Sequence, residues 1–286
     1  MTSGKTLDSG FADQPARNRL ARYATKHAVR RQRRFWSGRV ATWDQHGSAA
    51  LGRVTAAVLE AADVSPDAQV VDLGCGNGQI SLPLALAGAQ VLAVDVSPAM
   101  IRKLRSDARQ RGALTLDGLA LPIEELVLPP ASVDLVVSSY ALHHLRDPDK
   151  ARLVTAVYDW LRPGGRLLVA DMMFGRGASR RDRAIIRSKV VALARKGPGG
   201  WWRIAKNAAR YLLRVQERPV SMEAWTAMLT RSGFVGVTAT EIVAEAGLVA
   251  GQRPQNPVAD QILQPTLAWA RNRVEPRPGD AGRPGL

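Results

Sequence analysis

A glycine-rich loop and a nearby aspartate are the first residues of this chain that could do chemistry. Gly74, Gly76 and Gly78 stand at alternate positions after the apolar run VVDL, and Asp95 follows a second apolar run, VLAV. Positions without side chains let a ligand approach the backbone closely. A carboxylate at the end of a strand can accept hydrogen bonds from a vicinal diol such as a ribose. The spacing therefore predicts a site for a nucleoside-type ligand.

Buried strands are needed to position these residues. The two apolar runs are short and continuous, which suits strands that are buried on both faces of a parallel sheet. Between them, ISLPLALAGA is long enough for a crossover helix that Gly88 ends. Residues 70–95 are therefore expected to form a strand–loop–helix–strand unit.

The loop reads G-x-G-x-G after Asp72, and not the G-x-G-x-x-G of dinucleotide sites. In this it resembles the S-adenosylmethionine (AdoMet) motif of class I methyltransferases. Two later stretches, SVDLVVSSYALHHLRDP and WLRPGGRLLVADMMF, look like the fourth and fifth strands of the small-molecule methyltransferases related to the ubiquinone/menaquinone C-methyltransferases. The resemblance covers residues 43–174 well and 220–254 more loosely. It does not fix the methyl acceptor, because this fold serves many acceptors.

The resemblance implies an α/β fold with a Rossmann-like, doubly wound sheet of seven strands. The sheet would be mostly parallel with an antiparallel last strand, and a helical lid would be inserted after strand 5. The chain would then divide into a basic N-terminal helical extension (1–40), a methyltransferase domain (41–254, lid about 176–218) and a flexible Pro/Gly/Arg-rich tail (255–286). SMEAWTAMLTRSGF, with Ser221 as N-cap, reads as the final helix. The residues after it would supply the sixth and seventh strands.

The same resemblance assigns residues to AdoMet. Asp72 and the glycine loop would hold the methionine moiety, and Asp95 would hold the ribose hydroxyls. Val96 and Met100 would wall the adenine. The full expected set of cofactor-binding residues is Asp72, Gly74, Cys75, Gly76, Gly78, Asp95, Val96, Met100, Ile123, Glu124 and Ser138.

One position departs from the family pattern. Relatives commonly place an Asp-Ala-Glu-like triplet before the aspartate of the fourth strand, where this chain has Pro122-Ile123-Glu124. Pro122 offers neither a carboxylate nor a backbone N–H. Adenine recognition must then fall to the backbone of Ile123, which we favour, to Glu124, or to Asp117.

Methyl transfer from a sulfonium is an in-line displacement, in which the enzyme mainly aligns the acceptor and excludes water. For a phenol, an enol or an activated ring carbon, a base helps to remove the acceptor proton, and histidine is the usual candidate. His143 and His144 follow the expected fourth strand, so each is a candidate base. The alternative is that one of them only hydrogen-bonds the loop backbone. Tyr140 is a third catalytic candidate, Asp171 is a further residue of the rim, and His46 could cap the acceptor pocket.

Cysteine usage and hydropathy indicate the cellular compartment of the protein. Cys75 is the only cysteine, so an intrachain disulfide is excluded and a reducing, cytoplasmic compartment is expected. Within the glycine loop it reads as a small structural residue. No metal-binding cluster is visible, and no metal is expected. We see no apolar run suited to a signal peptide or a membrane span.

The formal net charge of +15 is concentrated in two segments. Residues 1–40 carry ten Lys and Arg against two acids, and residues 176–218 carry thirteen against two. From Trp201 the apolar residues follow helical spacing, with basic residues on the opposite side. A basic amphipathic helix that begins with Trp201-Trp202 can lie in the headgroup layer of an anionic membrane. The alternative is that its apolar face packs over a soluble acceptor.

We therefore expect an AdoMet-dependent methyltransferase of the cytoplasm. Its acceptor would be a small, lipophilic molecule such as a quinol, a phenol or a lipid-like metabolite, with peripheral contact to an anionic membrane through the basic lid. The alternative is a methyltransferase-fold protein that uses its basic arms as an RNA- or ribosome-associated factor. Few aromatic residues are interleaved with the basic ones and no RNA-binding module is recognisable, which disfavours nucleic acid as a partner.

Overall fold

The computed structural model describes residues 49–175, 180–194 and 218–255. The expected N-terminal helix, His46, the basic helix from Trp201 and the C-terminal tail lie outside these ranges. The strands are β1 (Gln69–Leu73), β2 (Gln90–Asp95), β3 (Leu116–Ala120), β4 (Val133–Ser139), β5 (Leu161–Met172), β6 (Val235–Val243) and β7 (Ala246–Gln252). The helices are α3 (Ala49–Ala62), α4 (Ser81–Leu86), α5 (Pro98–Arg111), α6 (Asp147–Trp160), α7 (Arg180–Ala194) and α9 (Met222–Arg231), with the short 3-10 turns η2 (Ile123–Glu125) and η3 (Leu142–His144).

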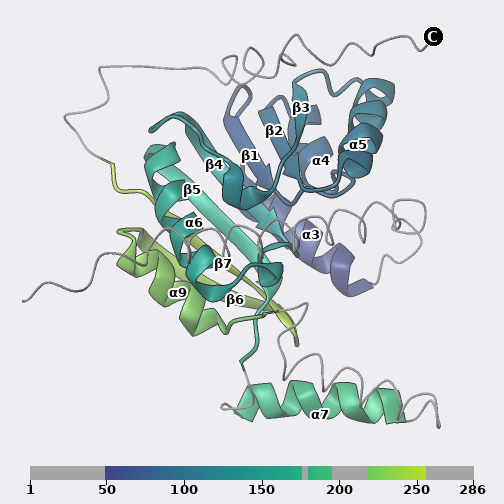
Figure 1. Cartoon of the computed structure of the whole chain (residues 1–286), viewed down its shortest axis with the longest axis vertical. Helices are drawn as coiled ribbons and strands as arrows, with labels where there is room; N and C mark the ends of the chain where they lie inside the picture. Colours follow the sequence, from purple (N-terminus) through teal and green to yellow (C-terminus); the bar gives the residue numbers. More distant parts are fainter. Residues whose placement is uncertain (1–48, 176–179, 195–217, 256–286) are drawn as a thin grey trace, which may run out of the picture.

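The seven strands of the described residues form one sheet, in the order β3-β2-β1-β4-β5-β7-β6 (Figure 1). Neighbouring strands from β3 to β5 are parallel. β7 runs antiparallel to both of its neighbours, β5 and β6. The prediction of a seven-stranded, mostly parallel sheet with an antiparallel last strand is confirmed.

Helices cover both faces of the sheet (Figure 1). α3, α4 and α5 pack on one face in a core that includes Val70 and Leu135. α6 and α9 pack on the other face in a core that includes Val71 and Val136. Adjacent residues of one strand thus enter opposite cores, because side chains alternate across a strand. This explains why the apolar runs in the sequence are continuous.

Local chemistry sets the helix ends. Ser97 caps α5, because its hydroxyl accepts a hydrogen bond from the Met100 N–H at 3.4 Å, and Gly112 follows the helix with a left-handed φ of 75°. Ser221 caps α9 in the same way, accepting from the Ala224 N–H at 3.3 Å, as predicted.

The residues Pro163-Gly164-Gly165 lie within the span of β5. Val133 of β4 pairs with Leu161, and the next pair joins Leu135 to Arg166. Residues 162–165 therefore bulge out of the ladder, and α6 passes directly into β5 at Trp160.

The strand order reverses beside β1. From β1 the chain moves outward to β2 and β3, and then returns to β4 on the other side of β1. In an open α/β sheet, ligands bind outside the carboxyl ends of the strands at such a reversal. The fold thus places the glycine loop after β1, Asp95 at the end of β2 and the histidine pair after β4 at one edge.

Candidate functional site

A cavity opens at the carboxyl ends of β1, β2 and β4. It encloses about 990 Å³ when the open solvent at its mouth is counted. Gly78, Ser138 and His143 are not among its lining residues. The predicted site residues that line it are Asp72, Gly74, Cys75, Gly76, Asp95, Val96, Met100, Ile123, Glu124, Tyr140 and His144.

The three loop glycines have positive φ values of 76°, 54° and 90°. A Cβ atom at Gly74 would lie 2.2 Å from the Cβ of Ala141, and one at Gly78 would lie 2.2 Å from Cδ1 of Leu104. Protein packing therefore excludes a side chain at both positions. At Gly76 a Cβ would meet no atom within 4 Å, although this residue lines the cavity. Gly76 thus leaves open space in which a ligand can approach its backbone.

Two backbone amides orient the carboxylate of Asp95. Its Oδ2 accepts from the Gly76 N–H at 3.1 Å, and its Oδ1 accepts from the Ser97 N–H at 2.7 Å. Burial raises the pKa of Asp95, while the two amides act in the opposite direction. Each oxygen keeps further acceptor capacity. This carboxylate is therefore arranged to accept hydrogen bonds from a diol at the tip of β2.

Asp72 lies deeper, with only 1 % of its surface exposed. The Ser81 hydroxyl donates a hydrogen bond to its Oδ2. Burial raises the pKa of Asp72 to about 7; the Ser81 hydroxyl opposes this rise and the nearby charge of Asp95 adds to it. A cationic group bound beside such an acid would favour its ionised form.

Ile123 and Glu124, two of the candidates for the adenine, line the cavity. They belong to η2, which follows Pro122. Asp117 is not part of the lining, and its carboxylate pairs with the Arg105 guanidinium at 3.2 Å. The geometry therefore favours the two η2 residues over Asp117.

Tyr140 enters the cavity from a strained backbone position. It directly follows β4, and its φ of 51° lies in the left-handed region that bulky residues rarely adopt. Its N–H donates to the Ala170 carbonyl at 2.9 Å. Burial raises the pKa of Tyr140 to about 12, and the carboxylates of Glu245 and Asp171 act in the same direction. The phenol stays protonated near neutral pH, so it can donate a hydrogen bond but cannot serve as a base.

The two histidines of η3 have different surroundings. His143 is buried, with its Nδ1 2.5 Å from Oδ1 of Asp171 and its backbone N–H donating to Oδ2 at 2.8 Å. His144 is half-buried and lines the cavity. Of the pair, His144 is therefore placed to meet a bound molecule, while His143 ties the loop to the end of β5.

The surroundings of Ser138 and Cys75 suit a structural role for both residues. The Ser138 hydroxyl donates to the Leu73 carbonyl at 2.8 Å and so joins β4 to β1. Burial raises the pKa of the Cys75 thiol well above its usual range, and the charges of Asp72 and Asp95 add to this. The thiol is thus protonated and a poor nucleophile. Across the described ranges, no group of three or more His, Cys, Asp or Glu residues is placed to hold a metal ion.

Sequence reasoning missed the contribution of α3. Leu51 and Thr55, one helical turn apart, line the cavity from this helix. Nothing in AALGRVTAAVLEAA marks these two positions, because the helix pattern only indicates one buried face. Asn77 and Gln79 also line the cavity, and their place within the glycine loop could have indicated this.

The chain is similar to a known protein family and to several curated proteins. Residues 70–165 match the family described as methyltransferase domain. Over 135 residues the chain is 35% identical to the ubiquinone biosynthesis O-methyltransferase of Xylella fastidiosa (strain 9a5c), a match that covers 46% of this chain and 54% of the relative. The chain thus spans about half the length of the curated relatives it matches.

Solved structures share the fold at low identity. A SAM-dependent methyltransferase from Aquifex aeolicus aligns with a TM-score of 0.53 and 16% identity, covering 76% of this chain and 98% of its own. The [4+2]-cyclase SpnF aligns with a TM-score of 0.53 and 16% identity, covering 72% and 82%. Likeness at this level concerns the fold alone, and the second structure indicates that one fold can serve different reactions.

Proposed function

We propose that this chain, whose residues 70–165 match the methyltransferase domain family, is an S-adenosylmethionine-dependent methyltransferase. The observation that carries the proposal is the Asp95 carboxylate, fixed by the N–H groups of Gly76 and Ser97 at the cavity. The residues present fit the cofactor. Asp95 would hold the ribose, open space beside Gly76 would take the nucleoside, and Asp72 would provide the counter-charge for the cationic methionine group.

The cofactor, when bound, supplies an electrophilic methyl group on a sulfonium. The residues of the chain hold the acceptor in line and keep water away. Tyr140, protonated near neutral pH, donates a hydrogen bond to an acceptor oxygen. His144 accepts the proton that the acceptor hydroxyl loses.

The acceptor in this proposal is a small, lipophilic molecule with a hydroxyl group, such as a phenol, a quinol or a lipid-like metabolite. Leu51 and Leu145 add apolar surface to the cavity around Tyr140 and His144. A relative named ubiquinone biosynthesis O-methyltransferase supports the same class of acceptor.

Calorimetry with AdoMet and S-adenosylhomocysteine tests the cofactor assignment. Asp95→Ala should weaken binding by about 1–3 kcal/mol, because the diol loses a charged acceptor. Asp117→Ala is the matched control, since Asp117 lies on β3 away from the cavity lining, and its affinity should equal that of the wild type. Equal affinities for all three proteins would reject the ribose assignment. Transfer of a labelled methyl group to catechols and hydroquinones, compared with amines and carboxylates, then tests the acceptor class.

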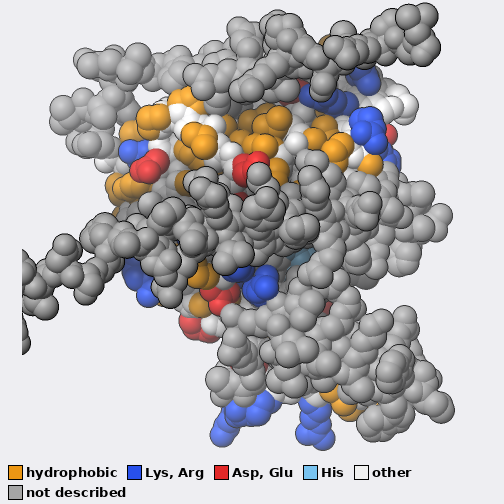
Figure 2. Space-filling view, in the orientation of Figure 1, with side chains coloured by type: hydrophobic (Ala, Val, Ile, Leu, Met, Phe, Trp, Pro, Cys, Tyr) orange, Lys and Arg blue, Asp and Glu red, His pale blue; other side chains and the backbone are white. Residues whose placement is uncertain are grey.

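We also propose that α7 touches an anionic membrane while the protein resides in the cytoplasm. Arg180, Arg183 and Arg187 are exposed and recur at helical spacing, and Val190 and Val191 continue the same face with 37% and 41% exposure. Figure 2 displays Lys and Arg side chains beside a hydrophobic patch at the foot of the molecule, where Figure 1 places α7.

The combination of basic and apolar groups favours lipid over RNA as the partner of α7, because an interfacial helix uses both. Asp182, the acid in this helix, is buried and accepts from the Gly175 N–H at 2.7 Å. It therefore does not interrupt the exposed basic face. Among the described helices, none has both the length and the apolar character needed to cross a bilayer.

A further inference from the structure

We propose that Lys150 is a positioning residue that fixes the cavity-lining loop, residues 140–145, against the backbone of Arg218. The inference rests on the proposed function, because this loop carries the proposed donor Tyr140 and the proposed base His144. Lys150 itself is not among the residues that line the cavity. It acts through the loop that it holds.

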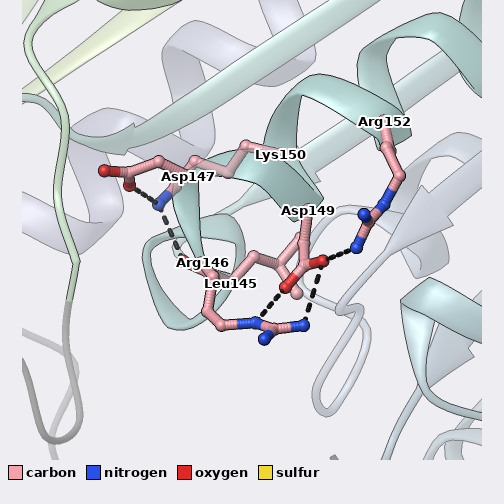
Figure 3. A network of polar contacts seen from close by, with 6 residues as sticks. All are labelled: Leu145, Arg146, Asp147, Asp149, Lys150 and Arg152. Atoms are coloured by element: carbon pink, nitrogen blue, oxygen red, sulfur yellow. Dashed lines mark hydrogen bonds and ion pairs between the residues drawn. The ribbon is translucent and has the colours of Figure 1, made fainter. Parts of the chain in front are cut away.

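The Lys150 side chain has no exposed surface. Its ammonium donates to the Leu145 carbonyl at 2.8 Å, to the Asp147 carboxylate at 3.1 Å and to the Arg218 carbonyl at 2.7 Å. Figure 3 shows the first two of these contacts at the start of α6. An ammonium has three N–H donors, so these acceptors match its capacity. Two of the three acceptors are backbone carbonyls. The contact therefore differs from an ordinary surface ion pair.

The peptide of Arg218 is held from both sides. Its carbonyl accepts from Lys150, and its N–H donates to the His143 carbonyl at 2.6 Å. His143 is in turn tied to Asp171 at the end of β5. These contacts form a closed ring, because Lys150 also bonds Leu145, which lies in the same loop as His143. The contact between His143 and Asp171 joins this ring to β5.

The ring bears on the site because Tyr140 is strained. A bulky residue with a left-handed φ keeps that conformation only when its surroundings over-determine it. The start of the loop is held by the hydrogen bond from Tyr140 to Ala170, and its end is held by Lys150 at Leu145. Removal of the ammonium would leave the buried Leu145 carbonyl and the partly buried Arg218 carbonyl without this donor and free the end of the loop.

A second charged cluster on the same helix provides a control. Asp149 accepts from Arg146 at 2.6 Å and from Arg152, as Figure 3 shows. Arg152 is 72% exposed, and its contact with Asp149 stays within α6. Arg152→Gln therefore removes one positive charge from the helix without touching the loop.

Hydrogen exchange and calorimetry on the full chain test the inference. Lys150→Met should speed exchange of the Arg218 and Leu145 amides and leave the amides of β1 protected. Affinity for S-adenosylhomocysteine should fall roughly tenfold, because the loop forms one wall of the cavity. Arg152→Gln should match the wild type in both measurements. Asp147→Asn should also stay close to it, because the two backbone carbonyls keep their donor.

The outcomes separate this inference from the proposed function. If the wild type does not bind S-adenosylhomocysteine, the proposed function fails, and the exchange data still test the ring. Wild-type protection at Arg218 in Lys150→Met would overturn the inference. Faster exchange throughout the protein would also overturn it, because Lys150 would then be a general stabiliser. An equally large loss of protection and affinity in Asp147→Asn would overturn it as well. If Lys150→Met does not fold, Lys150→Gln, which keeps N–H donors on a shorter side chain, is judged by the same criteria.

Discussion

Neighbouring residues of η3 have different roles because a 3-10 turn points successive side chains in different directions. His143 turns inward to the buried carboxylate of Asp171, and His144 reaches the cavity. A sequence that simply repeats a histidine therefore places one ring against a buried carboxylate and the other at the cavity.

Replacing each histidine in turn with glutamine should separate these roles. His144→Gln should lower methyl-transfer turnover by roughly 10²–10⁴-fold with cofactor affinity unchanged, because the base is lost. His143→Gln should lower the unfolding free energy by about 1–3 kcal/mol, because the buried carboxylate of Asp171 loses a partner. Turnover assays and urea denaturation measure the two effects. The assignment is wrong if His143→Gln abolishes turnover at wild-type stability while His144→Gln stays active.

Asp72 should make the stability of the ligand-free protein depend on pH. Its pKa rises from 3.8 in the unfolded chain to about 7 in the fold. Between these values the folded state holds a proton that the unfolded state has lost, so the unfolding free energy falls as the pH rises from about 4 to 7 and is level above. The full effect is about 4 kcal/mol. Urea denaturation at pH 5 and pH 8 measures this effect. The Asp72→Asn variant should gain stability relative to the wild type at the higher pH. The same pH dependence in both proteins would exclude Asp72 as the titrating group.

At the scale of elements, the loop between β1 and α4 combines positions fixed by packing with one left open for a ligand. Gly78→Ala should destabilise the fold by roughly 2–5 kcal/mol, because the new Cβ meets Leu104 and the φ is unfavourable. Gly76→Ala should lower the stability of the fold by only about 1–2 kcal/mol, because alanine disfavours the left-handed φ of this position. It should weaken S-adenosylhomocysteine binding, because its Cβ enters the open space. Thermal melts and calorimetry compare the two; tight binding by Gly76→Ala would show that the ligand lies elsewhere.

The elements were largely predictable because their signals are local. The continuous apolar runs indicated β1 and β2, the alternate glycines indicated the loop, and Ser221 indicated the start of α9. The contacts that complete the site are not local. Lys150 meets a carbonyl 68 residues away, at Arg218, and a helical pattern alone does not specify such a contact. Which histidine faces the cavity likewise depends on the position of Asp171, which comes from another strand.

At the scale of the whole molecule, the cavity loop and the basic segment are linked along the chain by β5. β5 ends beside the cavity loop and leads through residues 173–175 toward α7. Residues 176–218 carry thirteen Lys and Arg against two acids, whereas the rest of the domain is mildly acidic. In our proposal, a lipophilic acceptor is taken up from the anionic surface that α7 contacts.

Flotation with lipid vesicles tests this arrangement. The protein should float with vesicles that contain anionic lipid and stay behind with neutral ones, and added salt should weaken the binding. Substituting Arg180, Arg183 and Arg187 together with Gln should remove about 1 kcal/mol per residue. Val190→Ser with Val191→Ser should weaken binding even at low salt, because the apolar contact is lost.

A matched loss of charge elsewhere provides the control. Gln at Arg102, Arg109 and Arg111 removes three exposed charges from α5 and should leave vesicle binding nearly unchanged. If this variant releases the protein as completely as the α7 variant, binding follows net charge and α7 is not the contact. An RNA competitor at two salt concentrations covers the alternative partner. RNA affinity that falls linearly with salt on a logarithmic plot, together with no flotation, would favour nucleic acid over the membrane, because counterion release dominates such binding.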